Sequence, residues 1–370
     1  MKIMFFTLSL QNGGAERVIA SLSNEMAKKH DVIIATVHNS PDHYRLDETI
    51  KRDFLDKTQQ IEKSRLVRKI EKLSPKRISR LINIIEKESP EVIITFLPLP
   101  SFYIMAAKRF SKVVKDIPVI LSERADPGKE YQNKVIFGAM KEFFKNADGF
   151  VFQTEDARKF YDGIVKRETK IIENPINESF LSHRMPKNRR KIVVSCGRLE
   201  AQKNFKLLMR AFKGLVEKYP EYELEIYGEG SQKHELARFA KELDIDSKAH
   251  LKGRVENVAD KIADAELFIL SSNYEGMPNA LMEAMALGIP CIATDCPVGG
   301  PRALIKNGKN GVLINVGDEK QLVEAMTKIV SDKVFASRLS KNSREWSKGY
   351  TVEKVADKWE KYIEKVLGKR

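Results

Sequence analysis

Two carboxylates, Glu275 and Glu283, stand eight residues apart across a predicted strand-to-helix turn. Residues 268–270 have the apolar composition of a buried strand, and residues 279–287 have the Ala, Leu, Met and Glu content of a short helix. The start of such a helix offers backbone N–H groups and a positive dipole end, which together suit a phosphate. Two carboxylates can lie near a bound phosphate when each of them accepts hydrogen bonds from hydroxyl groups that flank the phosphate. A sugar and a ribose meet this condition, so the turn predicts a nucleotide-sugar site.

The negative charge of a diphosphate requires cations, and a second loop supplies two candidates. Residues 191–196 are typical of a β-branched strand, and Gly197, Arg198 and Lys203 follow it in the loop before an apolar-periodic helix. Arg198 presents a planar fork and Lys203 a point charge, so the two side chains can bind one anion. The alternative interpretation is that both are solvated surface charges. The position favours binding, because ligands of α/β sheets bind where strands end and helices begin.

These motifs resemble those of the retaining glycosyltransferases of family 4, which have the GT-B architecture. The resemblance covers essentially the whole chain, and its most specific part is Glu-x7-Glu preceded by the loop with the arginine and the lysine. In that family the arginine and the lysine hold the diphosphate, the first glutamate contacts the donor sugar and the second binds the ribose. The resemblance therefore implies these roles for Arg198, Lys203, Glu275 and Glu283.

The resemblance also implies the remaining donor contacts and the substrates. The loop after the predicted strand at residues 250–252 corresponds to the family's base-binding loop, where uridine is the commonest base. The donor-binding residues expected from the resemblance are Gly14, Gly197, Arg198, Lys203, Gly228, Gly253, Arg254, Val255, Glu275, Gly276, Met277, Pro278, Asn279, Ala280 and Glu283. The chain is most similar to bacterial N-acetylhexosaminyltransferases, which implies a UDP-sugar donor and a polyprenyl-diphosphate-linked glycan acceptor. It implies no cofactor and no metal, because cations and the helix start would stabilise the leaving diphosphate.

On the acceptor side the sequence leaves open which residue handles the acceptor proton. Many family 4 enzymes have a histidine after the strand that corresponds to residues 119–121. At that position this chain has Ser-Glu-Arg-Ala-Asp-Pro, residues 122–127, a pattern that it shares with some bacterial members. Glu123 and Arg124 are therefore candidate catalytic residues, and Arg124 and Asp126 are candidates for acceptor binding. Arg17 is assigned to the acceptor side as well. The alternative for Asp126 is that it caps a turn before the following proline.

Half of the net charge of +14 lies in residues 63–80, which have eight basic side chains and one acidic side chain. Arg65, Lys69, Lys72 and Lys76 follow helical spacing beside an apolar line, which predicts a basic amphipathic helix for an anionic membrane surface. The alternative is an ordinary solvated helix. The sequence has no run of 18 apolar residues and no aromatic-interleaved basic platform, so neither a membrane span nor a nucleic-acid partner is expected. The expected location is the cytoplasm, peripheral on the inner face of the cell membrane.

Strands and helices alternate in both halves of the chain, which predicts the α/β class with two Rossmann-like parallel-sheet domains. Residues 1–180 are expected to bind the acceptor and residues 190–350 the donor, with a cleft between them. A last helix, at about residues 352–370, is expected to pack back on the first domain. The predicted strands are Ile3–Phe6, Val32–Val37, Val92–Phe96, Val119–Leu121, Gly149–Gln153, Ile192–Cys196, Glu223–Tyr227, His250–Lys252, Leu267–Leu270 and Pro290–Thr294.

Other function classes fit the sequence less well. A nicotinamide-dependent oxidoreductase would explain Rossmann-like halves, but residues 12–17 do not match G-x-G-x-x-G. A non-catalytic sugar-binding protein would not be expected to keep both glutamates with the arginine and the lysine. Within the same family, glucose, galactose or mannose remain alternative donor sugars. The three cysteines are too few for a disulfide framework or a zinc site, so we expect them to be reduced.

Overall fold

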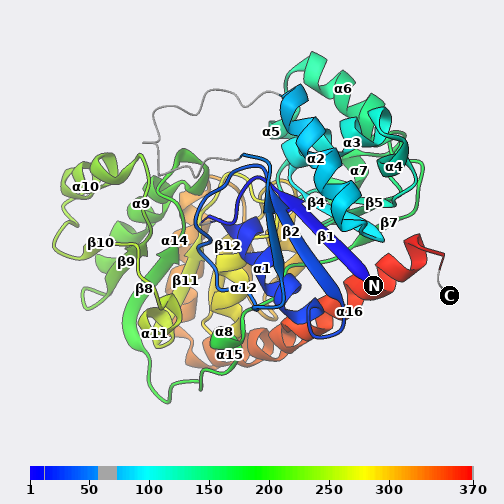
Figure 1. Ribbon diagram of the computed structural model, residues 1–370. Helices are drawn as coiled ribbons and strands as arrows, with labels where there is room; N and C mark the ends of the chain where they lie inside the picture. The colour runs from blue at the N-terminus through cyan, green and yellow to red at the C-terminus, as the bar shows by residue number, and fades with distance from the viewer. Residues whose placement is uncertain (12, 57–72, 369–370) are drawn as a thin grey trace. The chain divides into compact units, whose positions relative to one another are not determined.

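Buried apolar runs form the strands of two parallel sheets, each in its own unit of the computed structural model, which describes all residues except 12, 57–72 and 369–370. Unit 1 comprises Met1–Pro175 and Val352–Arg370, and unit 2 comprises Ile176–Thr351 (Figure 1). Residues 176–180, expected at the end of the first domain, belong to unit 2. The Ile176 N–H donates to the Tyr350 carbonyl, and Phe180 packs in the core of unit 2.

The sheet of unit 1 has seven parallel strands in the order β3-β2-β1-β4-β5-β6-β7. Its strands are β1 Lys2–Thr7, β2 Asp31–Thr36, β3 Lys51–Phe54, β4 Val92–Phe96, β5 Val119–Ser122, β6 Gly149–Phe152 and β7 Thr169–Ile171. The helices of the unit are α1 Gly14–Met26, α2 Pro75–Glu88, α3 Pro98–Phe110, α4 Lys112–Lys115, α5 Pro127–Glu130, α6 Lys134–Phe144, α7 Glu155–Phe160 and α16 Val352–Val366. The central strands read as continuous apolar runs because helices cover both faces of a parallel sheet.

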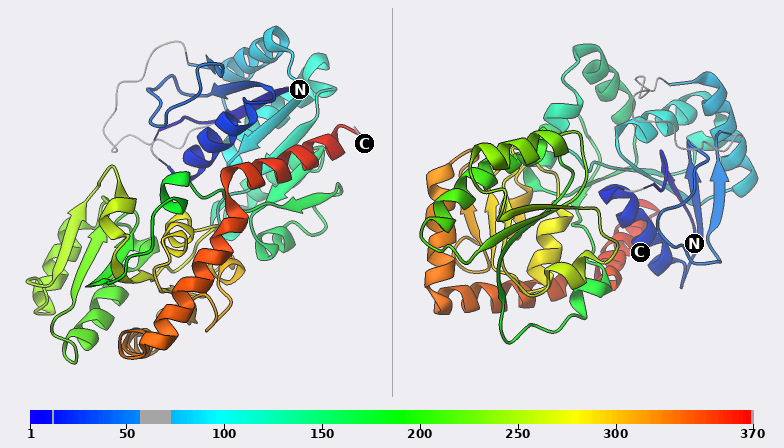
Figure 2. Two further views of the ribbon diagram at one scale, coloured as in Figure 1. Left: turned by 90° about the horizontal axis from the view of Figure 1, so that it is seen from below. Right: turned by 90° about the vertical axis from the view of Figure 1, so that its left-hand side faces the viewer.

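The last helix, α16, is part of the core of unit 1, as the sequence predicts. It lies beside α1 in the views of Figure 2. Trp359 is fully buried, with its ring 5.8 Å from that of Phe96. The Tyr362 hydroxyl accepts a hydrogen bond from the backbone N–H of Phe150 at 2.9 Å. These contacts join the end of the chain to β4 and β6.

The sheet of unit 2 has six parallel strands in the order β10-β9-β8-β11-β12-β13. Its strands are β8 Arg190–Cys196, β9 Glu223–Tyr227, β10 Ala249–Gly253, β11 Ala265–Leu270, β12 Cys291–Thr294 and β13 Val312–Ile314. Its helices are α8 Glu178–Leu181, the 3-10 turn η2 Ala201–Lys203, α9 Phe205–Val216, α10 Lys233–Glu242, α11 Val258–Ile262, α12 Asn279–Ala286, α13 Gly300–Leu304, α14 Glu319–Ser331, α15 Lys333–Ser347 and the 3-10 turn η3 Lys348–Tyr350.

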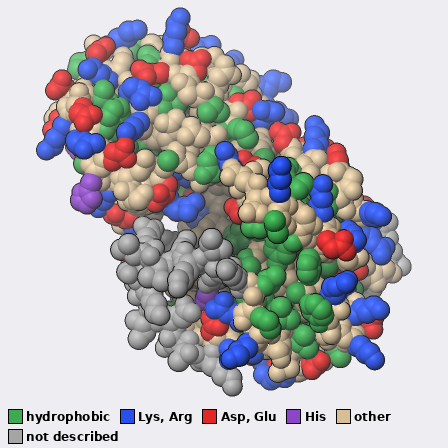
Figure 3. Space-filling view, turned by 90° about the horizontal axis from the view of Figure 1, so that it is seen from above, with side chains coloured by type: hydrophobic (Ala, Val, Ile, Leu, Met, Phe, Trp, Pro, Cys, Tyr) green, Lys and Arg blue, Asp and Glu red, His purple; other side chains and the backbone are tan. Residues whose placement is uncertain are grey.

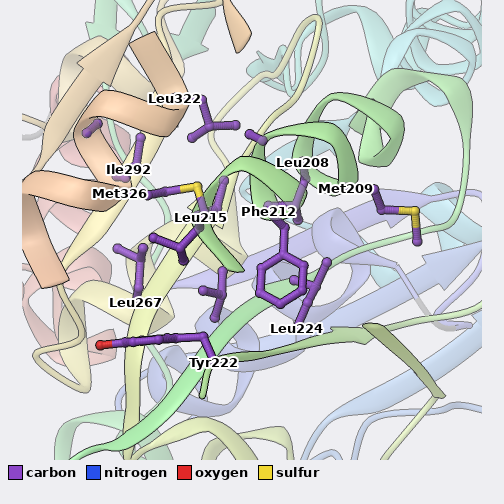
Figure 4. Packing of buried hydrophobic residues seen from close by; sticks show 14 of the residues in the cluster. Leu208, Met209, Phe212, Leu215, Tyr222, Leu224, Leu267, Ile292, Leu322 and Met326 are labelled. Carbon is purple, nitrogen blue, oxygen red and sulfur yellow. The ribbon is translucent and has the colours of Figure 1, made fainter. Parts of the chain in front are cut away.

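One face of this second sheet is covered by α9 and α14, as Figure 4 shows. Phe212 and Leu215 of α9 meet Leu224 and Leu267 of the sheet, and Met326 of α14 closes the same cluster. α9 starts at an asparagine that caps its first turn, and α14 starts at an aspartate that does the same. This packing fixes the strand ends from which the candidate site projects.

In both sheets the strand order reverses at one point, between β1 and β4 in unit 1 and between β8 and β11 in unit 2. Open α/β sheets bind ligands outside the carboxyl ends of the strands at such a point. The loops after β8 and β11 carry the arginine, the lysine and the first glutamate of the predicted donor site. The fold therefore brings together motifs that are far apart in the sequence.

The basic segment that the sequence assigns to a membrane surface is only partly described. Arg65, Lys69 and Lys72 lie outside the described residues, whereas Lys76 lies in the first turn of α2. Arg77 binds Asp56 with two hydrogen bonds of 2.9 and 2.7 Å. Within the described part of the chain, none of the helices combines the length and apolar character that a membrane span requires.

Candidate functional site

The loops after β8, β9 and β10 are joined by backbone hydrogen bonds at the carboxyl edge of the sheet of unit 2, which we call sheet 2. The Gly197 N–H donates to Tyr227 at 2.9 Å, and the Gly228 N–H donates to Gly253 at 2.8 Å. A Cβ on Gly228 would lie 1.9 Å from the Gly197 carbonyl oxygen, and Gly228 has a φ of 147°. Glycine is therefore required at position 228 for the close approach of these two loops.

The centre of the site is an ion pair between the two motifs that the sequence predicts for the donor. Lys203 Nζ lies 2.5 Å from Glu275 Oε1, and both side chains are largely buried. The same carboxylate oxygen accepts a hydrogen bond from Ser272 Oγ at 2.6 Å. A buried carboxylate with these two donors is held in one orientation.

Gln202 connects this ion pair to Arg198. Its side-chain amide donates to the Tyr274 carbonyl at 2.9 Å and to Glu275 Oε2 at 3.5 Å. Arg198 Nη2 donates to the amide oxygen of Gln202 at 3.3 Å. The arginine is exposed, so its guanidinium remains accessible to an anion at this edge of the sheet.

The turn from Glu275 to Pro278 is supported by the loop after β12. The Glu275 N–H donates to the Pro297 carbonyl at 2.7 Å, and the Val298 N–H donates back to the Glu275 carbonyl at 3.0 Å. A Cβ on Gly300 would lie 1.7 Å from the Gly276 carbonyl oxygen. Met277 is buried in the core below the turn.

The helix predicted from Asn279 is α12, whose N-cap is Pro278. Glu283 lies about one turn into α12 and is 8% exposed. Burial raises the pKa of the Cys196 thiol at the end of β8, and the nearby Glu283 carboxylate raises it further. The second glutamate therefore lies close to the end of the strand that precedes the Arg198 loop. All three cysteines are free, as predicted.

The expected base-binding residues lie at the end of β10 and directly after it. Gly253 ends the strand with a φ of 69°, and Arg254 is exposed. Val255 is half-buried and packs against the core on the α12 side of the sheet. This loop is joined to the Gly228 loop, so it belongs to the same edge as the predicted diphosphate residues.

The candidate residue Glu123 lies in unit 1, at the end of β5, and is enclosed by aromatic side chains. Its Oε2 accepts hydrogen bonds from the hydroxyls of Tyr131, at 3.3 Å, and Tyr161. Burial raises the pKa of Glu123 to about 7, while the Tyr161 hydroxyl acts in the opposite direction. The carboxylate faces its own unit's core, and this placement favours a structural role over direct contact with an acceptor.

Arg124 is stacked on aromatic rings and does not pair with Glu123 through its guanidinium. Its Cζ lies 4.2 Å from the centroid of Phe96 and 5.7 Å from that of Trp359, and Nη1 donates to Asn174 Oδ1 at 2.7 Å. Its Nε and Nη2 are buried and have no hydrogen-bond partner among the described residues. Burial lowers the pKa of Arg124 to about 9.

The remaining predicted residues of unit 1 lie at helix starts. Asp126 Oδ1 accepts a hydrogen bond from the Gly128 N–H at 2.9 Å and caps the four-residue α5, which is the alternative that the sequence left open. Gly14 is the first residue of α1, and Arg17 lies in its first turn. The Arg17 N–H donates to Gly13 at 3.1 Å.

Sequence reasoning missed Gln202, Ser272 and Gly300. The first two are polar residues in loops at the correct strand ends, which is the only signal that could have drawn attention to them. Gly300 follows another glycine after a strand, a position typical of close backbone approach. Among the residues that the structure describes, no group of three or more His, Cys, Asp or Glu side chains is placed to hold a metal ion.

Comparison with known proteins identifies the class of the chain. The family model "Glycosyltransferase Family 4" matches residues 12–180, and the model "Glycosyl transferases group 1" matches residues 176–346. The chain therefore belongs to the glycosyltransferases, with a family 4 domain followed by a group 1 domain.

The most informative curated relatives come from Campylobacter jejuni. One is GalNAc-alpha-(1->4)-GalNAc-alpha-(1->3)-diNAcBac-PP-undecaprenol alpha-1,4-N-acetyl-D-galactosaminyltransferase, 28% identical over 99% of both chains. Another is N-acetylgalactosamine-N,N'-diacetylbacillosaminyl-diphospho-undecaprenol 4-alpha-N-acetylgalactosaminyltransferase, 25% identical over 98% of this chain and 99% of the relative.

Solved structures share the two-sheet architecture. Sucrose-phosphate synthase from Thermosynechococcus elongatus has a TM-score of 0.82 at 17% identity and covers 100% of both chains. HepE of Anabaena, solved with UDP, has a TM-score of 0.77 at 15% identity and covers 99% of this chain and 100% of that one. The chain has the GT-B fold, with two Rossmann-like units.

Proposed function

We propose that the chain is a retaining glycosyltransferase that moves an N-acetylhexosamine, such as GalNAc or GlcNAc, from a UDP-sugar to a polyprenyl-diphosphate-linked glycan. The observation that carries the proposal is the Lys203–Glu275 ion pair at the point where the strand order of sheet 2 reverses. The names of the two Campylobacter jejuni relatives support the choice of sugar and acceptor. The reaction would belong to the assembly of cell-surface polysaccharide or glycan, in the cytoplasm and at the membrane. Unit 2 would bind the donor and unit 1 the acceptor.

The proposed reaction separates charge between the sugar and the leaving diphosphate. Arg198 and Lys203 would bind the diphosphate, and the N-terminus of α12 would add backbone N–H donors. Glu275, held by Ser272 and Gln202, would accept hydrogen bonds from hydroxyls of the donor sugar. Glu283 would bind the ribose. Two cations and a helix start supply the stabilisation that a metal ion gives in other transferases, so we propose that the reaction needs no metal.

The activity is tested by incubating the protein with a panel of UDP-sugars and a polyprenyl-diphosphate-linked acceptor glycan, and by measuring UDP release and the mass of the product. We expect an N-acetylhexosamine donor to react faster than UDP-glucose or UDP-galactose. Turnover with a hexose donor alone would contradict the proposed sugar and leave the class of enzyme intact. The anomeric configuration of the product, read by NMR, tests retention.

The metal-free mechanism is tested by chelation. Activity should survive excess EDTA, and Arg198→Ala should lose about 10²–10³-fold in rate, the order expected for one preorganised donor to a developing charge. Added Mg²⁺ or Mn²⁺ should not restore the variant. Full loss of wild-type activity with EDTA, reversed by Mn²⁺, would contradict the mechanism.

The roles of the two glutamates are tested separately. Glu283→Gln should weaken the binding of UDP and of UDP-sugar alike, because both contain the ribose. Glu275→Gln should impair transfer and leave UDP binding nearly unchanged. Isothermal titration with equal UDP affinity for wild type and Glu283→Gln would remove the ribose assignment.

A further inference from the structure

The guanidinium of Arg124 in unit 1 has surroundings unlike those of most basic groups of the chain. Lys and Arg side chains are scattered over the face that Figure 3 shows, where they meet solvent. Arg124 instead lies over the ring of Phe96, with its Cζ 4.2 Å from the ring centroid, and donates from Nη1 to Asn174. Its Nε and Nη2 are covered by protein and have no hydrogen-bond partner in the part of the chain that the structure describes. Two donors of this buried cation are therefore unused.

These two nitrogens form one edge of the guanidinium, and their N–H groups can point at the two oxygens of one carboxylate. Arg52, Arg77 and Arg190 use the same edge to bind an aspartate, with one nitrogen on each oxygen at distances between 2.7 and 2.9 Å. The neighbouring Glu123 does not bind this edge of Arg124, because its carboxylate accepts from two tyrosine hydroxyls and from the Arg124 backbone N–H. The edge is thus of a kind that binds carboxylates elsewhere in this protein.

Two more unpartnered polar groups lie around Phe96, at the point where the strand order of unit 1 reverses. Phe6 of β1 pairs with Thr95 of β4, so Thr7 lies beside Phe96 at the next position. Thr7 Oγ1 and Trp359 Nε1 are buried and have no partner among the described residues. Buried polar groups of folded proteins are as a rule hydrogen-bonded, and ligands of α/β sheets bind at such a reversal point. The cluster therefore marks a candidate ligand site within unit 1.

The turn that leaves β4 next to this cluster has a strained backbone. Leu97 has a φ of 76° and a ψ of 157°, a conformation that residues other than glycine rarely adopt. Such residues are concentrated at active sites and ligand clamps. Leu97 is half-buried and packs against the core cluster that contains Phe96 and Trp359. The strain therefore lies beside the unpartnered polar groups.

The charge and the shape of the Arg124 edge favour a carboxylate over a diphosphate. Among the described residues, Glu123 is the only charged group that raises the pKa of Arg124. One guanidinium compensates one negative charge, whereas a diphosphate would bring further charge into a place that offers no second cation. A carboxylate is also planar, so both of its oxygens can lie in the plane of the guanidinium.

We propose that the Nε–Nη2 edge of Arg124 binds the carboxylate of an acidic sugar, such as a uronic acid, in the acceptor glycan. Arg124 is half-buried as a residue, so the sugar approaches from the surface, and the strained turn at Leu97 yields as it enters. Arg124 then determines which acceptor unit 1 selects. The inference rests on the proposed function, because that function assigns the acceptor to unit 1, and it adds the chemical class of the acceptor glycan.

The experiment measures the binding of glucuronate to the full chain by calorimetry and compares it with the methyl ester of the same sugar, which is neutral and of similar shape. The wild type should bind glucuronate about tenfold to a hundredfold more tightly than the ester, which is the range for hydrogen bonds to a charged group. Equal affinity of the wild type for the two sugars would overturn the proposal without the use of any variant.

A matched pair of variants tests the role of the arginine edge. Arg124→Lys keeps the charge and loses the paired N–H groups, so it should lose most of the preference for glucuronate over its ester. Arg158→Lys in the same unit is the control, because the same edge of Arg158 already binds Glu155, and it should keep the preference. Thermal denaturation shows whether both variants fold. A folded Arg124→Lys variant with the wild-type preference would overturn the proposal, and if this variant does not fold, the comparison of the two sugars in the wild type decides.

Competition and transfer assays separate the sugar carboxylate from the carrier and from the donor. Methyl diphosphate that displaced glucuronate from the wild type at lower concentration than unlabelled glucuronate would overturn the choice of a carboxylate. In the transfer assay, Arg124→Lys should raise KM about tenfold for an acceptor that ends in a uronic acid, and should leave KM for a neutral acceptor unchanged. Titration with UDP reports on unit 2 alone, so a failure to bind UDP would contradict the proposed function, whereas glucuronate binding decides this inference.

Discussion

Replacing Glu123 by Gln should remove a pH dependence of stability that the structure assigns to this carboxyl group. Burial raises its pKa from 4.5 to about 7 in the folded state. The folded protein then binds a proton that the unfolded chain has already lost, so the free energy of unfolding falls as pH rises from about 4.5 to about 7. One pKa unit corresponds to about 1.4 kcal/mol, so the loss above pH 7 is about 3 kcal/mol. The amide of the Glu123→Gln variant would be neutral at every pH and could still donate to the Tyr131 or Tyr161 oxygen.

The assay is urea denaturation of both proteins at several values between about pH 5 and about pH 8.5, where the carboxyl group changes its protonation state. Trp346→Phe as a background leaves Trp359 as the sole tryptophan, and its fluorescence reports on unit 1 because the ring is buried in that unit's core. The difference in free energy of unfolding between Glu123→Gln and the parent should grow with pH in favour of the variant. A difference that stays constant over this range would refute the raised pKa.

Three further predictions concern the site in unit 2. Gly300→Ala places a Cβ 1.7 Å from the Gly276 carbonyl oxygen and should abolish UDP-sugar binding in calorimetry, whereas Gly349→Ala, where nothing lies within 4 Å, should bind normally. Gln202→Ala should lower kcat more than it raises KM, because Gln202 orients Glu275 and Arg198; a change in KM alone would argue against this positioning role. Ser272→Ala should lower kcat about tenfold, the effect of losing one hydrogen bond to a charged group of about 1.5 kcal/mol, with UDP affinity unchanged in the same titration.

The sequence predicts the central strands of both sheets but misses β3, β7 and β13. All three are edge strands, which are covered less completely than the central ones. β3 reads Lys-Arg-Asp-Phe and contains no apolar run, because an edge strand needs only partial burial and tolerates charge. β7 and β13 have three residues each and are too short for a pattern along the chain to indicate them, whereas the five-residue edge strand β10 is predicted as residues 250–252.

The candidate site is predictable as a set of loops but not as a set of contacts. Lys203 and Glu275 are 72 residues apart, and their meeting depends on the strand order that places β8 next to β11. The motifs predict that both residues lie at strand ends, whereas the hydrogen bonds of Gln202 follow only from the loop conformation. The enclosure of Glu123 likewise depends on two tyrosines at the ends of α5 and α7, whose packing no spacing in the sequence reveals.

The Lys203–Glu275 pair has a consequence for how an anion can bind beside it. The two side chains are 14% and 8% exposed, and leaving one charge of a buried pair without its partner costs about 3–5 kcal/mol. A diphosphate that drew Lys203 away would impose this cost on Glu275 unless other donors remained. Ser272 and Gln202 supply such donors, one to each carboxylate oxygen, and the lysine has three N–H groups of its own. The proposed donor can therefore share Lys203 with Glu275, so that the cation meets the phosphate while the carboxylate keeps the orientation that the sugar requires.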